Sequence, residues 1–102
     1  MARAKKIRPV HPGGVLYEDF IVPTGISIHR LAMDLRVPAN RIGEIVKGER
    51  AISADTALRL ARYLGTSAEF WLGLQSDYEL EKAKDEPAAK IEREVRPLKR
   101  AA

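Results

Sequence analysis

A stripe of polar and small side chains near the middle of the sequence carries its clearest chemistry. Residues spaced i, i+3, i+4 and i+7 share one face of a helix, and this spacing joins Asn40, Gly43, Glu44 and Lys47. Ala39 and Arg41 flank the start of the stripe. An asparagine amide can pair bidentately with adenine, an arginine with guanine, and a carboxylate can accept from cytosine. The stripe therefore predicts a surface that reads bases in the DNA major groove.

The expected DNA contacts fall into two groups. Bases are expected to meet the side chains of the stripe and its start, with a thymine methyl against the alanine and close backbone approach at the glycine: Ala39, Asn40, Arg41, Gly43 and Glu44. Phosphates are expected to meet the N-terminus of the preceding helix and basic side chains near it, at the end of the stripe and in the loop that follows. These residues are Ser27, Arg30, Lys47 and Arg50.

A polar stripe alone is also what any exposed helix shows, so the charge distribution matters. Residues 27–50 hold five bases and three acids, whereas the rest of residues 12–76 holds two bases and four acids. The basic side chains thus collect where DNA would lie.

Two helices joined by a short turn would position the stripe. Ser27 is the expected N-cap of the first, which carries an apolar face spaced i, i+3, i+4 and i+7: Ile28, Leu31, Ala32 and Leu35. Val37-Pro38 ends it, because proline disfavours helical geometry in the residue before it and suits the first turn of the next helix. A short turn at about Arg36 to Pro38 results. The second helix runs from about Pro38 to Lys47, with Gly48 as a left-handed cap. This is the spacing of a DNA-binding helix-turn-helix.

Three further helices complete the expected fold. One begins after Pro12 and is stopped by Pro23 and Gly25. Another begins at Ser53 and ends at Gly65. A third begins at Thr66 or Ser67 and carries a bulky face: Phe70, Trp71, Leu74 and Tyr78. No segment alternates as a β-strand does, so five helices between residue 13 and about residue 84 predict an all-α domain.

The chain divides into an arm, a domain and a tail. Residues 1–11 hold four bases and no acid, so the formal charge of +4 resides in a basic N-terminal arm. The helix-turn-helix domain is expected over 12–80 and a charged tail over 81–102. Residues 88–96 carry a weak amphipathic pattern that favours a helix no more than a frayed segment.

Several classes of function are excluded by what the sequence lacks. With no cysteine among 102 residues, thiol catalysis and cysteine metal sites are impossible. His11 and His29 are isolated from acids or other histidines at metal-ligand or catalytic spacing. We therefore expect no enzyme activity, no metal and no cofactor. No apolar run approaches the roughly 20 residues of a membrane span, so a cytoplasmic protein without a membrane partner is expected.

Four blocks of sequence closely resemble the HigA-type antitoxins of bacterial toxin-antitoxin modules, which are Xre or lambda-repressor-like helix-turn-helix proteins. These blocks cover residues 23–27, 41–53, 55–67 and 70–75, and the opening element His11-Pro12-Gly13 matches as well. The resemblance implies a homodimer that binds a palindromic operator in its own promoter and represses its operon. It also implies a partner toxin, a HigB-like member of the RelE-like mRNA endonucleases, which the antitoxin neutralises.

Some alternatives remain open from the sequence. A solitary or phage-type repressor would show the same DNA-binding features, and a helical interaction module without DNA binding is a third possibility. The apolar residues Trp71, Leu72 and Leu74 are candidates for the dimer interface if they are exposed. Arg36 departs from the family pattern, since the turn of the motif usually carries glycine. A left-handed arginine there would cost about 1 to 2 kcal/mol.

Overall fold

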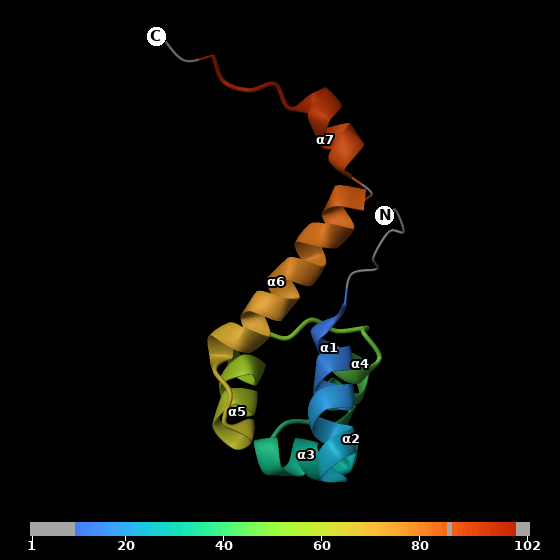
Figure 1. Cartoon of the computed structure of the whole chain (residues 1–102), viewed down its shortest axis with the longest axis vertical. Coiled ribbons are helices and arrows are strands. Elements are labelled where there is room, and N and C mark those ends of the chain that lie inside the picture. Colours follow the sequence, from blue (N-terminus) through green and yellow to red (C-terminus); the bar gives the residue numbers. More distant parts are fainter. Residues whose placement is uncertain (1–9, 86, 100–102) are drawn as a thin grey trace, which may run out of the picture.

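The computed structural model describes residues 10–85 and 87–99, which form helices and no strand (Figure 1). α1 (Pro12–Val15), the π-helical turn η1 (Leu16–Ile21) and α2 (Val22–Thr24) continue one another. They are followed by α3 (Ile28–Leu35), α4 (Ala39–Val46), α5 (Ala54–Leu64), α6 (Ala68–Asp85) and α7 (Ala88–Glu94). The all-α class is confirmed. With the first three elements taken as one, the described part of the chain has six helices instead of the expected five, and all but two residues of the basic arm lie outside it.

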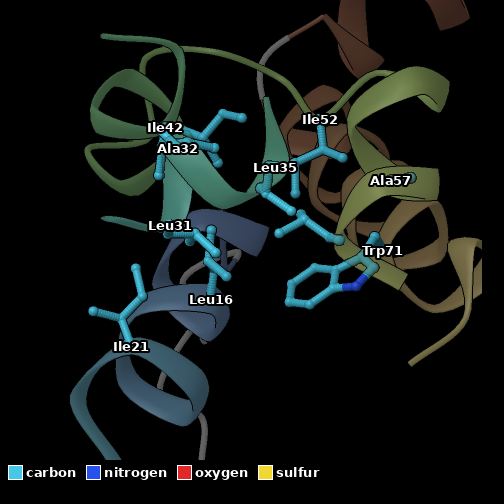
Figure 2. Close-up of a cluster of buried hydrophobic side chains, with 11 residues drawn as sticks. Leu16, Ile21, Leu31, Ala32, Leu35, Ile42, Ile52, Ala57 and Trp71 are labelled. Atoms are coloured by element: carbon cyan, nitrogen blue, oxygen red, sulfur yellow. The ribbon is translucent and has the colours of Figure 1, made fainter. Parts of the chain in front are cut away.

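The core lies where the N-terminal helical segment, the α3–α4 pair and the α5–α6 pair meet. Leu16, Leu31 and Trp71 are completely buried there, and Figure 2 shows Trp71 pointing into the cluster. Its indole N–H donates to the Thr66 hydroxyl at 2.7 Å, and its ring packs against Phe20 at a centroid distance of 5.4 Å. Trp71 was a candidate for the dimer interface only if it was exposed, and its complete burial places it in the core of the monomer instead. A domain this small uses its largest aromatic side chain to close the core.

The helix ends follow the expected capping chemistry at most positions. The Ser27 hydroxyl accepts from the backbone N–H of Arg30 at 3.0 Å, and the Ser53 hydroxyl accepts from that of Thr56 at 3.3 Å. Gly65 caps α5 in the left-handed region, with φ of 78°. These caps fix where α3 and α5 begin and where α5 ends, as predicted.

Pro23 does not stop the first helical segment, contrary to expectation. The segment continues to Thr24 and ends at Gly25, whose φ is 74°. The π-helical turn explains how proline is tolerated: the N–H of Val22 donates to the carbonyl of Tyr17, five residues back. This wider turn relieves the clash that a proline ring makes with the preceding turn of an α-helix.

Arg36 adopts the left-handed conformation, with φ of 63° and ψ of 44°. Among the described residues it is the one non-glycine with positive φ. Arg36→Gly removes this strain but loosens the unfolded chain, so we expect a net gain in unfolding free energy of about 0.5 to 1 kcal/mol. Denaturant unfolding measures it. The control Arg62→Gly, at an exposed helical position in α5, should lose about 1 kcal/mol. A loss at both positions would contradict the strain at Arg36.

His11 joins the start of the first helix to α6. Its Nδ1 accepts from the backbone N–H of Gly13 at 2.9 Å, and its ring meets Tyr78 edge-on at 4.7 Å. Burial lowers the pKa of His11 below its ordinary value of 6.5, and the charge of Lys82 lowers it further against the opposing effect of Glu79. The neutral ring that accepts this hydrogen bond is thus the form that the folded state favours.

This lowered pKa predicts a pH dependence of stability. Below pH 6.5 the unfolded chain binds a proton at His11 that the folded chain resists, so the unfolding free energy falls as the pH decreases toward the folded-state pKa. Urea unfolding at a series of pH values across that window measures this slope. His11→Asn keeps an acceptor at the N-cap without titrating, and should flatten the slope. Equal slopes for both proteins would contradict the role given to the imidazole.

Candidate nucleic-acid interface

α4 presents the predicted stripe at the surface. Its inner face is anchored by Ile42 and Ile45, both completely buried. On the outer face Ala39, Asn40 and Lys47 are exposed, while Arg41, Gly43 and Glu44 are partly exposed. Ala32, on the apolar face predicted for α3, is 1% exposed. The two helices and the turn at Arg36 thus hold the stripe outward on a rigid support.

Arg41 is not free at this surface. Its Nη1 lies 3.6 Å from Oδ2 of Asp55, the second residue of α5. The same oxygen accepts from Nε of Arg59 at 2.9 Å, and Nη1 of Arg59 donates to the carbonyl of Leu35 at 2.9 Å. Leu35 is the last residue of α3, so these contacts link all three helices around the motif.

Glu44 and Arg50 form a close ion pair, with Nε of Arg50 2.7 Å from Oε1 of Glu44. The sequence had suggested separate roles for them, a base contact and a phosphate contact. The fold brings them together, because the loop after α4 turns back beside the helix. Each can therefore meet DNA only as part of the pair or by leaving it.

The expected phosphate contacts lie at the N-terminus of α3 and at and beyond the C-terminus of α4. Ser27 and Arg30 lie at the N-terminus of α3, and Nε of Arg30 is 3.0 Å from Oδ2 of Asp34. The hydroxyl of Tyr63 donates to that same carboxylate. This hydrogen bond, helped by Arg30, holds the pKa of Asp34 below its ordinary value, so the acid stays ionised beside Arg30. Lys47, at the C-cap of α4, is exposed.

Asp55 and Arg59 are the residues that the sequence interpretation missed. Their i, i+4 spacing on one helix was a readable signal for a local ion pair. Their contacts with Arg41 and with the α3 carbonyl depend on how α5 packs, which no local pattern specifies.

Two negative findings apply to the part of the chain that the structure describes. No group of three or more histidine, aspartate or glutamate side chains there could hold a metal ion. No helix there is both long and apolar enough to cross a membrane.

Comparison with known proteins agrees with this geometry. The helix-turn-helix family matches residues 22–71. Virulence-associated protein I of Dichelobacter nodosus is 48% identical over 77 residues, which cover 76% of this chain and 71% of that protein. Antitoxin HigA-1 of Vibrio cholerae is 36% identical over 78 residues, 76% of this chain and 73% of that antitoxin. Antitoxin HigA of Pseudomonas aeruginosa, solved with the higBA promoter, has a TM-score of 0.85 and 46% identity, covering 90% of this chain and all of that one.

The chain belongs to the HigA-type antitoxins of the helix-turn-helix family. Members of this family are DNA-binding antitoxins and regulators, and the protein is accordingly not an enzyme. The helix that carries the predicted stripe lies inside the matched residues, as do Asp55 and Arg59. Within a HigA-type protein, α3 and α4 are thus the helix-turn-helix pair.

Proposed function

We propose that this HigA-type protein binds a palindromic operator in its own promoter as a homodimer, represses its operon, and neutralises a HigB-like toxin of the RelE-like mRNA endonuclease group. The observation that carries the DNA-binding part is the outward-facing stripe of α4, which is held on two buried isoleucines. The solved Pseudomonas aeruginosa relative with its promoter supports the same use of the fold.

The stripe would read DNA with its N-terminal half. Asn40 and Arg41 would contact purine edges, Glu44 a cytosine, and Ala39 a thymine methyl, while Gly43 lets the backbone approach. Ser27, Arg30, Lys47 and Arg50 would hold phosphates and so fix the register of α4 in the groove. The ion pairs of Arg30, Arg41 and Arg50 must then be rearranged or shared with DNA.

Gly43→Ala is expected to raise the stability of the fold while it lowers the affinity for DNA. A Cβ built at this position meets no atom within 4 Å, so Gly43→Ala should raise the unfolding free energy by about 0.5 to 1 kcal/mol. The same methyl group would occupy space at the groove, and operator binding should weaken. Thermal unfolding and fluorescence anisotropy measure the two effects. Unchanged operator affinity in the more stable variant would show that DNA does not approach the backbone here.

The homodimer would place two copies of α4 on the two halves of the palindrome. On α6, Leu72 is 37% exposed and remains available for such an interface. Leu74 is partly buried and packs against the core, and Trp71 is completely buried. Leu72 is therefore the strongest of the three interface candidates. A monomer at high micromolar concentration, measured by sedimentation, would count against a preformed dimer.

The toxin part of the proposal is tested by growth. The short reading frame beside this gene is expressed alone and together with this protein. Arrest by the neighbour that co-expression relieves supports an antitoxin. No arrest, or arrest that the protein cannot relieve while it still binds its upstream DNA, favours the solitary repressor.

The DNA part is tested by a salt titration on a duplex from the region upstream of the gene. Binding through several phosphates should weaken steeply and linearly on a logarithmic salt scale. A flat response, or no binding at low salt, would indicate a helical interaction module.

A further inference from the structure

Asp55 lies between Arg59 of its own helix, α5, and Arg41 of α4. We propose that Asp55, held in place by Arg59, is a positioning residue for Arg41 and controls how sharply Arg41 distinguishes bases. This inference rests on the proposed DNA-binding function. It adds to the predicted reading face two residues that contact none of the expected base edges themselves.

Arg59 joins Asp55 to the C-terminal end of α3 through one contact with each. Its Nε donates to Oδ2 of Asp55 at 2.9 Å, and its Nη1 donates to the Leu35 carbonyl, also at 2.9 Å. The last carbonyls of a helix have no partner within it, so Arg59 supplies one for α3. Because a guanidinium is planar and rigid, the two contacts together fix where the Asp55 carboxylate lies relative to the turn before α4.

Arg41 is held loosely by this carboxylate. Its Nη1 is 3.6 Å from Oδ2 of Asp55, and its side chain is 30% exposed. A guanidinium has five N–H donors, so this contact leaves others free for a base. Ordering a long side chain on binding costs conformational entropy. A carboxylate that restricts Arg41 beforehand lowers that cost for the correct base geometry.

Loss of Asp55 should therefore have two effects of opposite sign. The surface loses one negative charge, so its net charge becomes more positive, which strengthens binding to any DNA sequence. Arg41 loses its restraint, which weakens discrimination between the operator and other sequences. A residue that acted through its charge alone would change both affinities equally, and a residue needed only for folding would lower both.

The first measurement compares dissociation constants on the upstream duplex and on a scrambled duplex of the same length and composition. Asp55→Asn should bind the scrambled duplex a few-fold more tightly than wild type does, while the ratio of the two constants falls about fivefold or more, within the range for a base contact. Glu49→Gln removes one acid from the exposed loop after α4 and is the matched control. It should leave the ratio unchanged.

Arg59→Lys tests the positioning without a change in charge. A lysine cannot make the two-pronged contact, so the ratio should fall while binding to the scrambled duplex stays constant. Thermal unfolding of each variant shows that it is folded under the conditions of the assay. In an Arg41→Ala background, Asp55→Asn should no longer change the ratio, because the two residues act as one unit.

The outcomes separate this inference from the proposed function. A wild-type protein that does not distinguish the duplexes overturns both. Discrimination by wild type that persists undiminished in folded Asp55→Asn and Arg59→Lys overturns the positioning role alone. An Asp55→Asn effect of full size in the Arg41→Ala background would also overturn it.

Discussion

Gly13→Ala is expected to destabilise the fold strongly. A Cβ at this position would lie 1.7 Å from the carbonyl oxygen of Ile45 and 2.6 Å from its carbonyl carbon. These are backbone atoms of α4, so no side chain can rotate away, and α1 and α4 would have to separate. We expect a loss of at least about 3 kcal/mol, which exceeds ordinary overpacking, from a total near 5 to 15 kcal/mol. Circular dichroism during thermal unfolding measures it.

The neighbouring glycine provides the control. Gly14 lies in the same short helix, yet a Cβ there meets no atom within 4 Å. Gly14→Ala should therefore stabilise the protein by about 0.5 to 1 kcal/mol through the unfolded-state entropy of glycine. Two similar effects, of either sign, would contradict the close approach of α1 to α4. If the prediction holds, α1 packs closely against α4 and supports the helix that carries the predicted stripe.

The motif helices could be predicted because each has a local signal. Ser27 and Ser53 have the hydroxyl that an N-cap needs, and the apolar faces of α3, α4 and α5 repeat with helical spacing. The left-handed turn at Arg36 followed from the glycine that the family pattern places there. In each case the residues that determine the structure are within one or two turns of the feature.

Other features depended on contacts between distant residues. Nothing near Gly13 shows that its hydrogen atom faces the carbonyl of Ile45. Nothing near Trp71 shows whether its ring enters the core or faces a partner, since both uses favour a large aromatic side chain. The local rule for proline predicted a stop at Pro23, and the π-helical turn before it overrode that rule.

The same distinction applies to the candidate site. The outward position of the stripe followed from its spacing, because a helix with one apolar face must turn the other to solvent. The partners of its charged residues did not. Asp55 meets Arg41 through the packing of α5, and Arg50 meets Glu44 through the course of the loop between α4 and α5. The outward position of the stripe was thus predictable, whereas the ion pairing of its charged residues in the free protein was not.

Arg41→Ala and Lys47→Ala are expected to weaken DNA binding in different ways. Arg41 stands at the N-terminal end of the stripe, where side chains reach base edges, so its loss should cost about 1 to 3 kcal/mol on the operator and relax sequence preference. Lys47 follows the last turn of α4 and is exposed. Its loss should weaken binding to every sequence about equally and lower the salt slope by about 1. Titrations on operator and scrambled duplexes at several salt concentrations separate the two patterns.

A control for lost charge is available far from the reading face. Lys84 lies near the end of α6, which projects away from the core (Figure 1), and pairs with Glu81 at 3.4 Å. Lys84→Ala removes the same charge as Lys47→Ala but should leave the salt slope unchanged, because screening confines such effects to about 10 Å.

Equal losses of affinity for operator and scrambled DNA in Arg41→Ala would show that Arg41 contacts phosphate and not a base. The reading role would then fall to Asn40 and Glu44, the two polar side chains of the stripe that are expected to contact bases.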